Sequence, residues 1–218
     1  FLGFSAGFLG VFAIVMLYVT IDIPDPNADF KTETTNVYYS DGKTKIGSFA
    51  KQDRQSLDFD EIPQVMKDAV VAAEDRSFWE NNGIDLRGII RAARNNATSG
   101  QITGGGSTIP QQYIKILYLN QERSYTRKIK EALLSVKIHN QLTKSEILEG
   151  YLNTIYYGNG AYGIEVAAQT YFGISASELD LRQAAFLATV INNPSYFDPF
   201  TEGAKDRILP RYNYVLEG

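Results

Sequence analysis

The sequence contains no cysteine and only one histidine among its 218 residues. Without cysteine the chain has neither a disulfide framework nor a Cys-based metal site. The single histidine, His139, has no sequence partner that would complete a metal or catalytic site, so we interpret it as structural. An excess of positive charge is also absent. The formal net charge of -4 argues against nucleic acid as the main partner, because phosphate backbones are bound by surfaces rich in Lys and Arg.

Charged residues are missing from one long stretch, residues 1–21. As a helix rising about 1.5 Å per residue, this stretch would reach roughly 30 Å, the thickness of a bilayer core. It therefore predicts a transmembrane anchor. A cleavable signal peptide is the alternative, but it would have a shorter apolar region and a small-x-small cleavage site, which Tyr18–Asp22 does not offer. The acidic residues that follow, Asp22, Asp25 and Asp29, are compatible with an exterior location.

The remainder divides into a linker and a domain. Residues 22–59 contain two prolines and the turn pair Asp41-Gly42, which predicts a linker with a short hairpin, Tyr38–Ser40 and Lys45–Phe49. Residues 60–218 show helical periodicity and no internal repeat or low-complexity tract, which predicts a compact, mainly helical domain. The helical pattern is still running at the last residues, which indicates a piece of a longer protein.

Glu74 stands out within the first helix of that domain. It continues the i+4 row of Ile62, Met66 and Val70, so its carboxylate is expected on the buried face near the helix end. This helix should carry Pro63 in its first turn. A carboxyl that leaves water for an apolar face holds a proton more readily, which suits general base chemistry. The alternative is an ordinary salt bridge to Arg76 or another cation.

Four further helix starts fit the capping-box spacing, in which a Ser, Thr or Asp is followed three residues later by Glu or Gln. The pairs are Thr108 with Gln111, Thr143 with Glu146, Ser175 with Glu178, and Asp180 with Gln183. The last of these helices should stop near Pro194.

A glycine-rich loop, residues 104–107, feeds the first of these capped helices. Backbone N–H groups and small hydroxyls at such a helix start can bind an anion, although most glycine-rich turns hold no ligand. Downstream, Arg127 and Glu131 share one helix row, and Lys128 lies beside them, three residues before Glu131. Lys115 and Arg123 add to the local positive charge. This cluster would suit a diphosphate; a surface ion pair of little energetic weight is the alternative.

Between the loop and the cluster, Tyr113–Leu119 is too apolar for a loop but is interrupted by Lys115. The pattern fits a segment that touches the bilayer surface and fits a buried core segment equally well.

Taken together, these segments resemble, in chain order, the motifs of the peptidoglycan glycosyltransferase family, as in class A penicillin-binding proteins and monofunctional transglycosylases; a fragment of a class A penicillin-binding protein is favoured. The matching segments are Glu74-Asp-Arg-Ser-Phe78 with Gly83, Gly106-Ser-Thr-Ile-Pro-Gln-Gln112, Arg127-Lys-Ile-Lys-Glu131, Lys144 to Glu149 with Tyr151-Leu-Asn153, Tyr162 to Gly173, and Arg182 to Pro194. The resemblance covers roughly residues 60–218.

The resemblance implies a lysozyme-like helical domain with a small membrane-proximal jaw, preceded by one transmembrane helix in the bacterial cytoplasmic membrane and lying outside the cytoplasm. The implied reaction polymerises lipid II on a growing lipid-linked glycan, with Glu74 and Glu131 as catalytic residues. The implied substrate-binding residues are Asp75, Phe78, Ser107, Thr108, Gln111, Gln112, Lys115, Arg127, Lys128 and Tyr156, and the structural motif positions are Glu149, Asn153 and Arg182. The family also implies a divalent metal, Mg²⁺ or Mn²⁺, inhibition by moenomycin-type compounds, a following transpeptidase domain and contact with other cell-wall synthesis proteins.

Two positions depart from the family pattern. Asn82 stands where the family has His, and Pro110 stands where it has Thr. Asn82 keeps hydrogen-bonding capacity but no charge, and Pro110 would occupy the second helical position, where a missing N–H is tolerated; we expect activity to survive both. Two other functions remain open: a lysozyme-like hydrolase or lytic transglycosylase, which also uses a buried Glu but needs no cation cluster, and a noncatalytic scaffold that binds lipid II.

Overall fold

The computed structural model describes residues 16, 18–20, 35–38, 45–49, 56–85, 107–118 and 125–218. Of the membrane anchor predicted at residues 1–21, only four residues are described, and there the Thr20 hydroxyl donates to the Met16 carbonyl at 2.7 Å. No helix among the described residues is long and apolar enough to cross a membrane. The rest of the predicted anchor lies outside the described residues, and the predicted divisions at residues 21 and 59 remain predictions.

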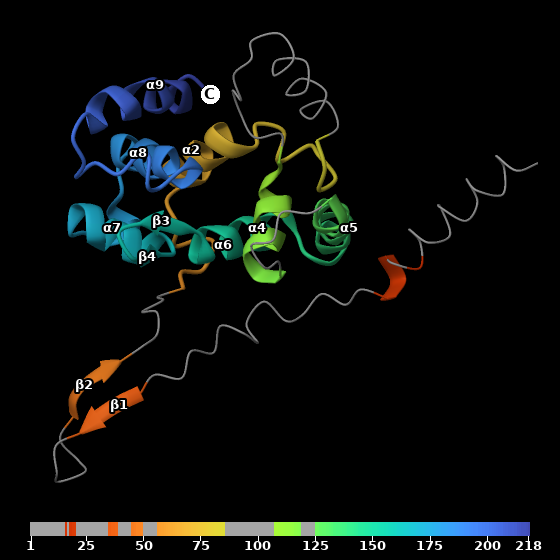
Figure 1. Cartoon of the computed structure of the whole chain (residues 1–218), viewed down its shortest axis with the longest axis horizontal. Coiled ribbons are helices and arrows are strands. Elements are labelled where there is room, and N and C mark those ends of the chain that lie inside the picture. The colour runs from red at the N-terminus through yellow and green to blue at the C-terminus, as the bar shows by residue number, and fades with distance from the viewer. Residues whose placement is uncertain are drawn as a thin grey trace, which may run out of the picture. The chain divides into compact units, whose positions relative to one another are not determined.

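The chain forms two compact units. The first unit combines Phe1–Pro24 with Ser77–Ile147, and the second unit combines Asp25–Arg76 with Leu148–Gly218. In the described residues the architecture is mainly helical with two small two-stranded sheets (Figure 1). The predicted fold class, mainly α with a short β element, is confirmed at this level.

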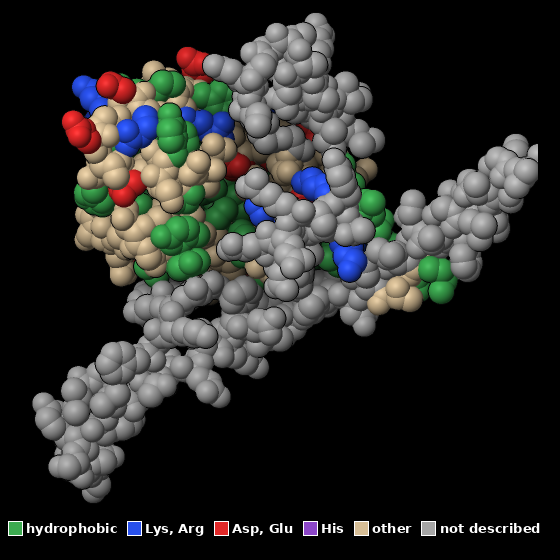
Figure 2. Space-filling view, in the orientation of Figure 1, with side chains coloured by type: hydrophobic (Ala, Val, Ile, Leu, Met, Phe, Trp, Pro, Cys, Tyr) green, Lys and Arg blue, Asp and Glu red, His purple; other side chains and the backbone are tan. Residues whose placement is uncertain are grey.

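Three helices form the core of the second unit: α2 (Gln64–Glu74), α8 (Leu181–Asn192) and α9 (Ala204–Leu216), each of which packs on the other two (Figure 1). Met66 and Val70 of α2 and Leu187 of α8 are fully buried, as a 3.6-residue apolar period requires. Pro63 is the N-cap of α2, one residue earlier than the predicted first turn. Over α9, charged side chains alternate with apolar ones on the face shown in Figure 2.

The second unit also contains helix α7 (Ile164–Phe172), the short 3-10 helix η1 (Ala176–Glu178) and the strands β1 (Thr35–Tyr38) and β2 (Lys45–Phe49). The predicted second strand is confirmed. The first was predicted too late, because β1 ends at Tyr38 and pairs back from Tyr38↔Lys45 to Thr35↔Phe49. β1 thus begins three residues and ends two residues earlier than predicted, and the predicted turn pair Asp41-Gly42 lies outside the described residues.

A second sheet was not predicted. Strands β3 (Tyr156–Gly158) and β4 (Ala161–Tyr162) are antiparallel, and both residues between them have positive φ: 49° for Asn159 and 78° for Gly160. Positive φ at both turn positions characterises a type I′ hairpin, for which Asn-Gly is the preferred pair. The pair Asn159-Gly160, lying between aromatic residues, could therefore have predicted this hairpin from the sequence.

In the first unit, α4 (Ile109–Tyr118) packs against α5 (Tyr125–Gln141), and α6 (Lys144–Thr154) begins there and continues into the second unit. Within α4, Tyr113 and Ile114 are buried whereas Lys115 and Ile116 are exposed. The segment predicted to be either core or bilayer contact thus has one buried and one exposed face.

All four predicted capping boxes are confirmed. In each, the backbone N–H of the cap residue donates to the Glu or Gln side chain, at distances of 2.7 to 3.2 Å. The Ser175 box opens a 3-10 helix, and the Asp180 box opens α8, which ends at Asn192, close to the predicted stop.

Candidate active site

Glu74 is the last residue of α2, and its side chain is only 7% exposed. The predicted burial of this carboxylate is therefore confirmed. Its Oε1 accepts a hydrogen bond from Nη2 of Arg211 at 3.0 Å, and the same nitrogen donates to the carbonyl of Ala73 at 2.7 Å. The salt bridge that the sequence allowed exists, but its cation is Arg211 of α9 and not Arg76.

The side chain of Tyr151, on α6, is fully buried in the same unit. Burial raises the pKa of the Tyr151 phenol well above its ordinary value, and the negative charge of Glu74 raises it further. This phenol therefore stays neutral at physiological pH. Glu74 and Tyr151 thus lie close enough in the second unit for the charge of one to act on the other.

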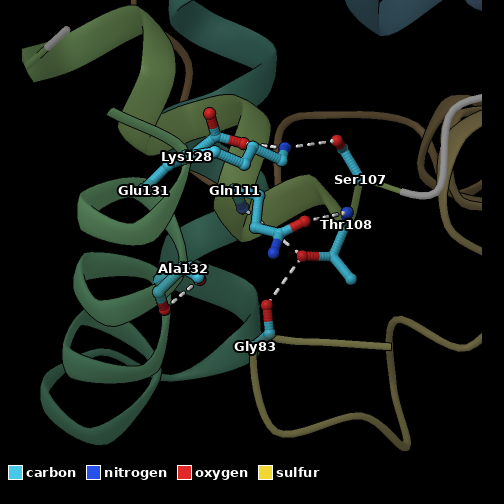
Figure 3. A network of polar contacts seen from close by, with 8 residues as sticks. Gly83, Ser107, Thr108, Gln111, Lys128, Glu131 and Ala132 are labelled. Atoms are coloured by element: carbon cyan, nitrogen blue, oxygen red, sulfur yellow. Dashed lines mark hydrogen bonds and ion pairs between the residues drawn. The ribbon is translucent and has the colours of Figure 1, made fainter. Parts of the chain in front are cut away.

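The other carboxylate, Glu131, lies on α5 in the first unit and is 2% exposed. Nζ of Lys128, one turn earlier, lies 2.5 Å from its Oε1 and also donates to Oγ of Ser107 at 3.0 Å (Figure 3). The Lys128 side chain is 52% exposed. The predicted i+3 pair is thus confirmed, and it offers a positive charge to the solvent beside the start of α4. The side chain of Arg127 lies outside the described residues.

The start of α4 is fixed by an interlocked set of hydrogen bonds (Figure 3). Thr108 and Gln111 form the capping box, and the Thr108 hydroxyl also donates to the carbonyl of Gly83 at 2.7 Å. Both side chains are buried. Thr108 and Gln111 were predicted to bind substrate, and this stays a prediction; the hydrogen bonds that their side chains make with described residues are to backbone groups, because an N-cap side chain satisfies otherwise unpaired N–H groups.

Phe78 was also predicted to bind substrate, but its ring is fully buried. It packs edge-on against Trp79 with ring centroids 4.9 Å apart, and Nζ of Lys144 lies 4.7 Å from its centroid. Phe78 is therefore a packing residue in this structure. A motif shows that a residue type is required but does not separate packing from substrate contact.

The remaining predicted binding residues differ in exposure. Asp75 is buried, Gln112 is half-buried, and Lys115 is exposed on α4. Tyr156 is exposed on β3, and its ring lies 4.6 Å from that of Tyr162. Tyr156 thus presents an aromatic surface in the second unit.

Two of the three predicted structural positions make structural contacts. Glu149 accepts the N–H of Phe59 at 3.0 Å, and the Asn153 amide bonds both the N–H and the carbonyl of Leu57. These bonds fix the segment before α2 to α6. Arg182 is exposed, and its Nε lies 3.8 Å from Asp180, so it does not hold the fold in the same way.

The two residues that depart from the family pattern, Asn82 and Pro110, both occupy positions that tolerate the change. Asn82 is exposed, and Pro110 is the second residue of α4, where its missing N–H removes no helical hydrogen bond. Among the described residues, no group of three or more His, Cys, Asp or Glu side chains is arranged to hold a metal ion.

One functional candidate, Arg211, was missed from the sequence. Its partner Glu74 lies 137 residues earlier. No local pattern of charge spacing reports a pair of that separation, so the contact becomes visible only once α9 is seen to pack on α2.

These features define a helical protein with two buried carboxylates, each held by a cation, in a chain whose motifs follow one family in order. The sequence profile of that family, described as transglycosylase, matches residues 42–218. The chain belongs to the transglycosylase family, which confirms the resemblance drawn from its motifs.

Individual relatives agree. The chain is 40% identical over 217 residues to penicillin-binding protein 1A of Neisseria flavescens, covering 98% of this chain and 27% of that protein. It is 42% identical over 223 residues to penicillin-binding protein 1A of Aquifex aeolicus (strain VF5), covering 97% of this chain and 30% of that protein. The chain thus spans less than a third of these relatives. A crystal structure of penicillin-binding protein 1A from Haemophilus influenzae aligns over 85% of this chain and 18% of that one, at 26% identity and a TM-score of 0.43.

Proposed function

We propose that this chain is a peptidoglycan glycosyltransferase that polymerises lipid II into β-1,4-linked glycan strands, inverting the anomeric centre and releasing undecaprenyl diphosphate. The observation that carries the proposal is the presence of two separately held carboxylates. Glu74 is buried beside the cation Arg211, and Glu131 is buried beside Lys128, whose charge is presented to solvent. Family membership supports the same reaction.

Glu74 acts as the general base. The acceptor 4-hydroxyl gives its proton to the carboxylate, and the acceptor oxygen forms a bond to the anomeric carbon of the donor. The bond from that carbon to the diphosphate oxygen breaks, and the diphosphate leaves with the electron pair. Attack opposite the α-linked diphosphate yields a β linkage, and no water is activated.

Lys128, together with Ser107 and the start of α4, binds the diphosphate leaving group. A diphosphate leaves as a stable anion, so it needs positive charge and N–H donors and no strong acid. Lys128 already lies 3.0 Å from Ser107 at the helix start, and its exposed side chain can reach an incoming anion. A hydrolase acting on glycan strands would have no use for this cation.

The proposal includes a divalent metal only as an ion that would bind together with the diphosphate of the substrate. The described residues do not form a cluster able to hold a metal alone. Mg²⁺ commonly binds through one or two carboxylates together with substrate phosphates, so Glu131 would be the protein ligand. We derive no step through the metal.

We also propose the fold, the membrane anchor and the cellular location that this reaction requires. A lysozyme-like fold with a membrane-proximal jaw, an anchor in the bacterial cytoplasmic membrane and an extracytoplasmic location all suit a lipid-linked substrate. The greater length of the relatives, and their description as penicillin-binding, support a following transpeptidase domain in the full protein.

The test is the substitution Glu74→Gln, which keeps the shape of the side chain and removes the base. Polymerisation of labelled lipid II by the detergent-solubilised chain should fall by about 100-fold or more, the usual contribution of a general base. Muramidase digestion of the product, separated on a gel, identifies the polymer as glycan.

The matched control is Glu202→Gln, because Glu202 is an exposed glutamate of the same unit. It should polymerise at the rate of the unmodified chain. Equal turnover of the two variants would overturn the assignment of Glu74 as the base. Shortening of added glycan strands, without polymer, would indicate a hydrolase, and binding of lipid II without either reaction would indicate a scaffold.

A further inference from the structure

Two arginines connect the end of α2 to α9 in the second unit. Arg76 donates from Nε to the carbonyl of Ala72 at 3.2 Å and from Nη2 to the carbonyl of Tyr214 at 3.0 Å. Arg211 runs the other way, from α9 to Ala73 and Glu74. Both guanidinium groups lie near the ring of Tyr214, at 4.3 Å for Arg76 and 5.1 Å for Arg211. The two arginines therefore both connect α2 to α9, and Arg211 also forms an ion pair with Glu74.

Joining α2 to α9 does not by itself require an ion pair between Arg211 and Glu74. Arg76 joins the two helices through carbonyl oxygens and an aromatic ring, without pairing to a carboxylate in the contacts the structure gives. Arg211 is more buried, at 19% exposure, and its Nε makes no hydrogen bond within the part of the chain that the structure describes. Buried ion pairs are a weak source of stability because both charges lose their hydration. A partly buried arginine with an unsatisfied N–H therefore stabilises the packing of two helices only weakly.

The geometry of Arg211 does suit control of the carboxylate. Glu74 ends α2, so its long side chain has no following helical turn to restrict it. One nitrogen of Arg211 bonds both the Glu74 carboxylate and the carbonyl of Ala73, the residue just before it. The guanidinium is therefore fixed to the α2 backbone and to the carboxylate at once, while its own backbone is held in α9.

We propose that Arg211 is the positioning residue of the general base: it holds the Glu74 carboxylate in one orientation, ready to accept the proton of the acceptor hydroxyl. This inference rests on the proposed function of Glu74. Arg211 exchanges no proton; it remains a cation before and after the transfer, while the acceptor O–H bond breaks and a carboxyl O–H bond forms on Glu74. A positioned carboxylate increases the rate of the chemical step more than it increases substrate affinity.

The experiment compares Arg211 with Arg76 in the detergent-solubilised chain, using labelled lipid II. Arg211→Ala should lower kcat by about 10- to 100-fold with KM changed less than about threefold, since loss of orientation acts on the chemical step. Arg76→Ala should keep kcat within about threefold of the unmodified chain, because it removes a comparable tether and leaves the Glu74 pair in place.

Two more variants separate positioning from folding. Arg211→Lys keeps the charge and can donate to the carboxylate, so it should recover at least about fivefold of the lost kcat. Arg211→Gln keeps a donor for the Ala73 carbonyl but no charge, so it should fold and yet remain as slow as Arg211→Ala. Thermal unfolding of each variant checks that the slow ones are folded; an Arg211→Ala variant that does not fold leaves the comparison between the Lys and Gln variants as the test.

Several results would overturn the inference. They are an equal loss of kcat in Arg76→Ala and Arg211→Ala, a Lys variant no faster than the Gln variant, or a loss confined to KM. The double variant Glu74→Gln with Arg211→Ala should be no slower than Glu74→Gln alone, because the two residues act as one unit. If Glu74→Gln is itself fully active, the proposed function fails; if it is inactive while Arg211→Ala is normal, only the positioning role fails.

Discussion

The two carboxylate–cation pairs of this protein differ in the cation and hardly at all in the anion. The side chains of Glu74 and Glu131 are 7% and 3% exposed, so both carboxylates have left water. Their partners are 19% exposed for Arg211 and 52% exposed for Lys128. A half-exposed cation can exchange its partner for an incoming anion, whereas a buried one is committed to the carboxylate it holds. This difference supports the proposed division, in which the Glu74 pair serves proton transfer and the Lys128 pair serves anion binding.

The residue types agree with this division. Arginine has a planar group with five fixed donors, which suits holding a carboxylate and a carbonyl in a defined geometry, as Arg211 does. Lysine is a compact charge on a flexible stem, which suits a site whose ligand arrives and leaves. Lys128 also lies beside the start of α4, where the helix dipole adds positive potential.

The substitution expected to have the largest effect in this comparison is Lys128→Ala. If Lys128 binds the diphosphate, its removal loses a charge-assisted hydrogen bond of about 1.5 to 3 kcal/mol, and KM for lipid II should rise roughly 10- to 100-fold. In contrast to Arg211→Ala, the loss should appear in KM more than in kcat. Steady-state kinetics over a range of lipid II concentrations measures both.

Lys130→Ala is the matched control, because Lys130 is an exposed lysine two positions farther along α5. Its KM should stay within about twofold of the unmodified chain, as expected for a surface charge without a specific ligand. The division between the pairs breaks down if the two lysine variants have the same KM, or if Lys128→Ala acts on kcat alone.

A smaller effect is expected from Gly83→Ala, which perturbs only the unit that contains Lys128. The carbonyl of Gly83 anchors Thr108 at the start of α4, and a Cβ on this residue would lie 2.6 Å from the carbonyl oxygen of Ser135. Its φ of +87° adds strain for any L side chain. We expect the free energy of unfolding to fall by about 2 to 4 kcal/mol.

Gly160→Ala separates the two causes of the expected loss at Gly83, the backbone strain at positive φ and the close contact made by the added Cβ. Gly160 has a φ of +78°, but a Cβ there would meet nothing within 4 Å. It should therefore lose only about 1 kcal/mol, the strain contribution alone. Urea denaturation of both variants gives the comparison, and equal losses would mean that the close approach of Gly83 to α5 does not matter.

The contrast between the pairs is also a contrast in what sequence can reveal. The i+3 spacing of Lys128 and Glu131 and the four capping boxes are local patterns, and the structure confirms them. The burial of Glu74 followed from the i+4 row of α2. Regular local geometry fixes each of these, so spacing alone was sufficient.

Features that depend on packing were not predictable in this way. The pairing of Arg211 with Glu74 needs α9 to lie on α2, and the bond from Thr108 to Gly83 needs a loop to reach a helix start. Phe78 and Thr108 were predicted from the motifs to bind substrate; both are buried here, and their contact with substrate stays a prediction. A motif records that a residue type is needed, and only the packed structure shows what that residue contacts.

The smallest expected effect concerns His139, which lies on the same helix as Lys128. Burial lowers the pKa of His139 below its ordinary value of 6.5, and the positive charge of Lys144 lowers it further. The unfolded chain therefore binds this proton more readily than the folded chain, so stability should decline as the pH falls through about 6.5 toward the lowered pKa. Above that window the histidine is neutral in both states and contributes no pH dependence.

His139→Gln removes this titration, and because the chain has a single histidine the assignment is direct. The difference in Tm between the variant and the unmodified chain should shift in favour of the variant by a few degrees between about pH 7.5 and pH 5.5. Carboxylates titrate in both proteins and cancel in that difference. A difference that stays constant over this range would show that His139 is protonated as easily in the folded chain as in the unfolded one, and that the neighbourhood of α5 is more open to water than its burial indicates.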